Sequence, residues 1–76
     1  MDEDYKNRVT VEKYELDGRI ERLEKFTAGD IGSFVDQPER SRLDRQLMAM
    51  RGYSAILGER ITAFGGPVNK VSSDTA

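Results

Sequence analysis

The chain has 76 residues, of which 37% are apolar and 34% charged, and it contains no cysteine and no histidine. Without these two residue types the chain can form no disulfide bond and lacks the usual zinc ligands. It also lacks the commonest general base and the strongest nucleophile of enzymes. We therefore expect one small non-enzymatic domain without metal or cofactor. A formal net charge of −2 also falls short of the concentrated positive charge that binding to duplex DNA requires.

The first expected element is an amphipathic helix over about residues 4–27. Apolar residues recur at steps of three, four and seven, which places them on one face of a helix. They are Val9, Leu16, Ile20, Leu23 and Phe26. Gly18 interrupts the middle of this segment, and it indicates either a close backbone approach or a tolerated helical glycine.

A bend is expected at residues 28–36, where two glycines and a serine follow the end of the first apolar pattern. Phe34 and Val35 are apolar, so we expect the bend to fold back over the end of the helices. Asp36, Pro38 and Glu39 then provide an acidic N-cap, a proline in the first turn and a capping-box glutamate. This combination predicts that a second helix begins at residue 37.

The second helix is expected over about residues 37–64, and two apolar rows run along it. The first row is the seam facing the first helix, with a single polar place at Ser54; it comprises Leu43, Leu47, Met50, Leu57, Ile61 and Phe64. The second row lies on the adjacent face and comprises Ala49, Tyr53, Ile56, Arg60 and Ala63. Two glycines and a proline end the helix, and we expect residues 67–76 to form a disordered tail after a domain at residues 1–66.

These elements predict an all-α fold, an antiparallel two-helix hairpin that oligomerises into a helical bundle. One helix partner leaves the second row in water, so we expect Ala49, Tyr53, Ile56 and Ala63 to form the interface of a homo-oligomer. The alternative is a monomer that covers this surface with its own bend and tail. No apolar run approaches the length of a membrane span, so no membrane partner is expected.

Five residues are candidates for holding a ligand. Tyr53 and Arg60 project from the same row of the second helix and combine an aromatic plane for a base with a guanidinium for a phosphate. Lys25 and Thr27 could add an ammonium and a hydroxyl, and Arg45 belongs to a helix whose cations are all arginine. The competing interpretation is structural: Tyr53 packs in the interface, Lys25 and Thr27 finish a helix, and the arginines form a solvated face.

Residues 45–61, RQLMAMRGYSAILGERI, preceded by LDGRIERLEKF at residues 16–26, resemble a family of very small helical proteins encoded by tailed phages and prophages. The shared pattern, RQLxAMxxYxxILxxRI, includes Tyr53, Ile56 and Arg60. The resemblance implies an accessory protein that acts against host defence by binding, in the cytoplasm of a bacterial host.

Two mechanisms follow from the resemblance. In the first, an oligomer encloses a nucleotide immune signal, for example a cyclic nucleotide, in clefts between protomers. In the second, the hairpin docks on a host defence protein or nuclease and inhibits it stoichiometrically. A structural or assembly role is a third possibility. We expect the first, because a doubled apolar face favours symmetric assembly and symmetric clefts suit symmetric cyclic nucleotides.

Overall fold

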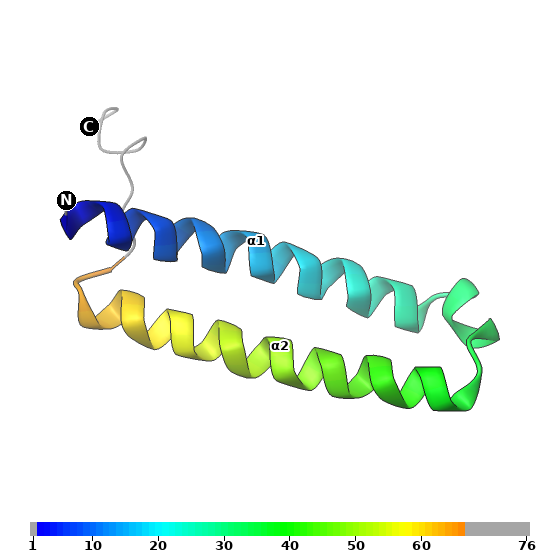
Figure 1. Cartoon of the computed structure of the whole chain (residues 1–76). Helices are drawn as coiled ribbons and strands as arrows, with labels where there is room; N and C mark the ends of the chain where they lie inside the picture. The colour runs from blue at the N-terminus through cyan, green and yellow to red at the C-terminus, as the bar shows by residue number, and fades with distance from the viewer. Residues whose placement is uncertain (1, 67–76) are drawn as a thin grey trace.

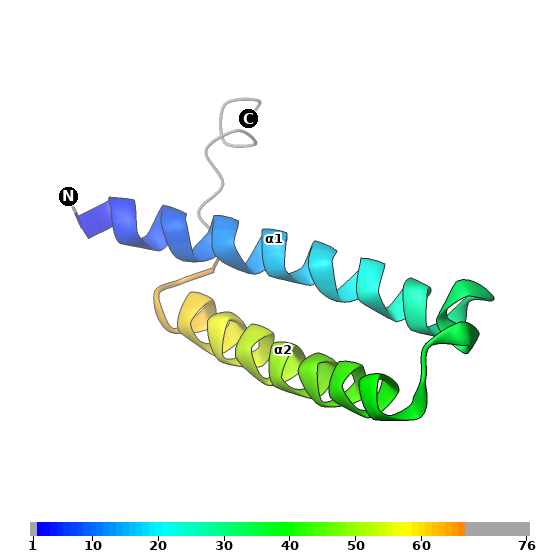
Figure 2. The same cartoon turned by 45° about the vertical axis from the view of Figure 1, so that its right-hand side comes forward.

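The computed structural model describes residues 2–66, which form two long helices joined by a short 3-10 turn (Figure 1). Helix α1 spans Asp2–Ala28, the turn η1 spans Ile31–Phe34, and helix α2 spans Gln37–Ala63. The two helices lie side by side and run in opposite directions (Figures 1 and 2). The predicted all-α antiparallel hairpin is therefore confirmed, while the tail predicted at residues 67–76 lies outside the described residues.

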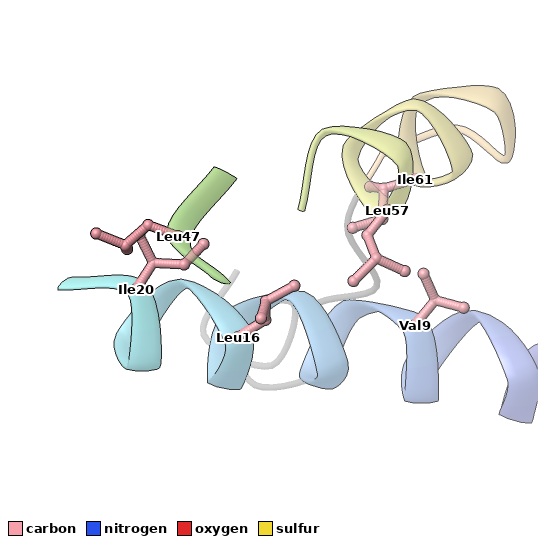
Figure 3. Close-up of a cluster of buried hydrophobic side chains, with 6 residues drawn as sticks. All are labelled: Val9, Leu16, Ile20, Leu47, Leu57 and Ile61. Carbon is pink, nitrogen blue, oxygen red and sulfur yellow. The ribbon is translucent and has the colours of Figure 1, made fainter. Parts of the chain in front are cut away.

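The core is one seam of apolar side chains between the helices (Figure 3). Its buried members are Val9, Leu16 and Ile20 from α1 and Leu47, Leu57 and Ile61 from α2. Leu57 is the most buried, with 1% of its surface exposed. The principal extents of the molecule are 48 × 23 × 17 Å, so the hairpin is a single layer. Each helix buries one stripe of residues, and the outer and lateral faces of both helices reach solvent.

The bend folds back against the end of α1, as expected, and its backbone at Gly32 approaches α1 closely. A Cβ atom at Gly32 would lie 2.2 Å from the carbonyl oxygen of Phe26, so this close approach requires glycine. The guanidinium of Arg40 donates to the carbonyl oxygens of Thr27 at 2.9 Å and Gly32 at 3.1 Å. The side chain of Phe34, which we expected over the hairpin end, is instead 85% exposed.

The start of α2 matches the sequence signals only in part. Asp36 occupies the N-cap position and Pro38 lies in the first turn, but the Asp36 side chain makes no capping hydrogen bond. The Oε1 atom of Glu39 accepts a hydrogen bond from Arg42 at 2.8 Å. The predicted capping box is therefore wrong, because the glutamate pairs with an arginine one turn further along α2.

At the end of the hairpin opposite the bend, two glycines terminate α2 and an aromatic pair joins the two helices. The amide of Gly66 donates to the carbonyl of Ile61 at 2.8 Å. Gly65 and Gly66 have φ angles of 105° and 106°, a conformation that favours glycine. The rings of Tyr5 and Phe64 meet edge to face, with centroids 6.1 Å apart, and so tie the start of α1 to the end of α2.

Candidate ligand-binding site

One lateral side of the hairpin is held together by polar contacts between the helices. Lys13 Nζ donates to Ser54 Oγ at 2.7 Å and to Asp17 Oδ2 at 3.0 Å, and Ser54 Oγ donates to Asp17 Oδ1 at 2.5 Å. The hydrogen bond from Ser54, assisted by Lys13, lowers the pKa of Asp17 below its ordinary value of 3.8, although desolvation acts in the opposite direction. The hydroxyl of Ser54, the polar side chain in the seam, thus finds its hydrogen-bond partners in two residues of α1.

A second cross-helix contact lies on the same side. Arg51 donates to Oε2 of Glu24 through Nε at 3.2 Å and through Nη2 at 2.5 Å. Glu24 follows Asp17 by seven residues, which returns it to the same side of α1. We call this side, with Lys13, Asp17, Glu24, Arg51 and Ser54, the paired face.

The opposite lateral side carries a groove in which the charged groups have no such partners. Arg19 follows Asp17 by two residues, a rotation of about 200° around the helix. The residues that line the groove, which we call the arginine groove, are Arg19, Arg22, Leu23, Phe26, Gln46 and Met50, and they surround a volume of about 350 Å³. None of the six is acidic, and among residues 2–66 neither arginine forms an ion pair.

Two of the five predicted ligand residues lie on the groove side of α2. Tyr53 and Arg60 follow Gln46 by seven and fourteen residues, so all three share one stripe of the helix. Tyr53 is 46% exposed. Arg60 is exposed in the last turn of α2 and has no ion-pair partner within residues 2–66.

The other three predicted ligand residues lie toward the bend. Lys25 Nζ is 3.4 Å from Glu21 Oε2, and Thr27 Oγ1 donates to the carbonyl of Glu24 at 3.1 Å. Arg45 is exposed near the start of α2 and lies about 22 Å along that helix from Arg60, given the rise of an α-helix. A single protomer therefore does not gather the five residues into one pocket.

The row predicted as an oligomer interface lies in solvent in the single protomer. Ile56 is 55% exposed, and Ala49, Tyr53 and Ala63 are also exposed. Within residues 2–66, the hairpin thus offers no cover for this row.

Sequence reasoning missed a second groove, on the paired side near the start of α1. Tyr14, Lys13, Asp17 and Thr62 are among the residues around its volume of about 430 Å³. Tyr14 is 80% exposed. Its position outside the apolar series of the first helix was the available signal. The carboxylate of Asp17 makes this groove unfavourable for an anion.

Two further properties bear on function. Within residues 2–66, no group of three or more acidic, histidine or cysteine side chains is placed to hold a metal ion. Neither helix in that part of the chain is apolar enough over a sufficient length to cross a membrane.

Comparison with known protein families gives a match over most of the chain. The family model named Sequestin matches residues 3–63, which include both helices, the bend and the arginine groove. The chain belongs to the Sequestin family. The family name indicates a sequestering protein, that is, a binding rather than a catalytic role. Searches of curated proteins and of solved structures find no match.

Proposed function

We propose that this Sequestin family member is a non-enzymatic anti-defence protein of phage origin. It forms a homo-oligomer in the cytoplasm of a bacterial host and sequesters a cyclic nucleotide signal in clefts between protomers. The observation that carries the proposal is the exposed row of Tyr53 and Ile56 beside Arg60, whose guanidinium has no ion-pair partner within residues 2–66, in a chain whose family is named for sequestration.

The small core supports assembly. Six apolar residues are buried among those described, and a core of this size seldom stabilises a fold by more than about 3–5 kcal/mol. A second copy packed on the exposed row would bury Tyr53 and Ile56 and add to that core. If the oligomer is symmetric and closed, each cleft between protomers would be lined by the same side chains.

The exposed polar groups support an anionic, planar ligand. Among residues 2–66, Arg45 and Arg60 form no ion pair, so their guanidinium groups can form paired hydrogen bonds with phosphate, and Tyr53 offers a ring on which a base can stack. Lys25 and Thr27 would contribute near the bend by exchanging their present contacts with Glu21 and the Glu24 carbonyl for contacts with the ligand. Arg45 and Arg60 are too far apart on one helix for one small ligand to contact both, so a site that uses both groups needs more than one protomer.

A protein ligand is the second candidate. Met48 and Ile56 are large apolar residues of α2 that are more than half exposed, and such surfaces often bind other proteins. In this case the hairpin would inhibit a host defence protein or nuclease by docking on it.

Two measurements test the proposal. Light scattering should give a mass of two or more chains at micromolar concentration. A thermal-shift screen with cyclic di- and trinucleotides should then identify a ligand, since a ligand at 100 times its Kd stabilises a protein by about 2.7 kcal/mol. Arg60→Gln should reduce the shift, whereas the matched control Arg8→Gln should not. A screen without any shift would contradict nucleotide sequestration and favour docking on a protein.

A further inference from the structure

The two arginines of the arginine groove lack the internal contacts that several other cations of the hairpin make. Lys13 and Arg51 bridge the helices, and Arg40 binds carbonyl oxygens at the bend. Arg19 and Arg22 are three residues apart, so they lie on the same rim of the groove, and they have no ion-pair partner within residues 2–66. Glu15, Asp17 and Glu21 lie beside these arginines on the outer surface of α1, but none of the three lines the groove, and among residues 2–66 none is within ion-pair distance of either guanidinium. Two adjacent guanidinium groups on the rim of such a groove are suited to an anion, and phosphate matches their planar donors.

The remaining lining of the groove is suited to a flat, partly apolar group. Phe26 is 39% exposed, and Leu23 and Met50 are partly buried beneath the groove. Gln46 reaches the groove from α2, and its Nε2 lies 3.8 Å from Met50 Sδ, a weak contact that a better acceptor would replace. The groove is a shallow, open depression of about 350 Å³, so a ligand lying in it in one protomer would keep one face in solvent.

We propose that the arginine groove binds a nucleoside phosphate. The phosphate lies between Arg19 and Arg22, the base packs on Phe26 and Met50, and the amide of Gln46 hydrogen-bonds to the edge of the base. This inference rests on the proposed function, because it assigns part of the sequestered nucleotide to residues of one protomer that the sequence pattern did not identify.

The second groove is a poorer site for the same group. There the ammonium of Lys13 is already bound by Ser54 Oγ and Asp17 Oδ2. The Asp17 side chain is 47% exposed and would repel a phosphate. The arginine groove, whose lining has two arginines and no carboxylate, is therefore the more favourable of the two for a phosphate.

Isothermal titration with cyclic di-AMP, cyclic di-GMP and a cyclic triadenylate tests the assignment. The double variant Arg19→Gln/Arg22→Gln should bind the tightest of these probes at least about tenfold more weakly, since each lost charge-assisted contact with a phosphate contributes that much or more. The matched control Arg8→Gln/Arg42→Gln removes two arginines that form exposed ion pairs with Asp4 and Glu39. Its affinity should stay within about twofold of the wild type.

The outcomes separate this inference from the proposed function. Wild-type affinity in the double variant would overturn the groove assignment and leave nucleotide sequestration in place. An equal loss in the double variant and the control would also overturn it, because the effect would then come from net charge. Gln46→Ala, on the other helix, should weaken binding without changing charge and provides a second test if the double variant does not fold. Failure of the wild type to bind any probe would overturn both proposals.

Discussion

Ser54 shows what sequence spacing reveals about a single residue and what it omits. Its place in the apolar seam follows from the helical pattern, but its partners Lys13 and Asp17 lie 41 and 37 residues earlier in the chain. Those contacts depend on the register of α2 against α1, which the periodicity of either helix alone does not specify. With them formed, no buried side-chain nitrogen or oxygen among the described residues lacks a hydrogen-bond partner.

The low pKa of Asp17 predicts a pH-dependent contribution to stability. Because the folded state favours the charged carboxylate, its contribution is present above the ordinary pKa of 3.8 and is lost as the pH falls through the lowered value. Asp17→Asn should reduce the free energy of unfolding at neutral pH by about 1 kcal/mol, the net value of one hydrogen bond. Urea unfolding should show that this difference shrinks below about pH 4. A difference that is the same at pH 7 and pH 3 would contradict the assignment.

Glycine-to-alanine substitutions at two positions should have opposite effects. At Gly32 the added Cβ would meet the backbone of Phe26 and Thr27, so Gly32→Ala should destabilise the fold by about 1–3 kcal/mol. At Gly18 the nearest atom is the Arg22 guanidinium at 3.4 Å, so Gly18→Ala should stabilise α1 by up to about 1 kcal/mol. Thermal unfolding measures both changes. A destabilised Gly18→Ala protein would mean that another molecule packs closely on this face.

At the scale of the elements, the corner between α1 and α2 depends on a contact that the sequence did not predict. The guanidinium of Arg40 binds a carbonyl at the end of α1 and one in η1, although it belongs to the first turns of α2. It therefore fixes three consecutive elements to one another. An arginine near the start of a helix is ordinarily exposed, so composition and spacing alone gave no reason to assign it this role.

Replacing Arg40 should loosen this corner. Arg40→Ala removes two charge-assisted hydrogen bonds and should reduce the free energy of unfolding by about 1–2 kcal/mol, since the side chain is partly exposed. Arg40→Lys should cost less, because an ammonium can still reach one of the carbonyls. The control Arg42→Ala loses only an exposed pair with Glu39 and should stay within about 0.5 kcal/mol. Equal losses in Arg40→Ala and Arg42→Ala, measured by urea unfolding, would show that the contacts at the corner contribute nothing.

At the scale of the whole molecule, seven-residue spacing was enough to predict the hairpin, because two helices with one apolar stripe each have few ways to bury it. The same spacing placed Tyr53 and Arg60 on one side of α2. It could not identify the arginine groove, because Arg19 and Arg22 alternate with acids along α1 and this pattern is typical of a solvated face. Only the packed pair of helices gives Arg51 a partner on the other helix and leaves Arg19 and Arg22 without an ion pair among residues 2–66.

The exposed row of α2 predicts the effect of a charge at Ile56. In a single protomer Ile56 is 55% exposed, so Ile56→Asp should retain the helical content. In an oligomer that buries the row, the carboxylate would be desolvated without a partner, and the mass in solution should fall toward that of one chain. The control Ser41→Asp adds the same charge at an exposed position of α2 outside the row. A wild-type protein that is monomeric at micromolar concentration would contradict the oligomer.

The separation of charge between the two sides of the hairpin has a practical consequence for purification. The hydrogen bonds of Ser54 with Lys13 and Asp17 on the paired face are short and partly buried, so added salt weakens them little, whereas the open arginines hold an anion mainly through forces that mobile ions screen. A concentrated salt wash should therefore strip a captured metabolite from the folded protein. Extracts of protein isolated in dilute buffer, analysed by mass spectrometry, should retain what the cell had loaded.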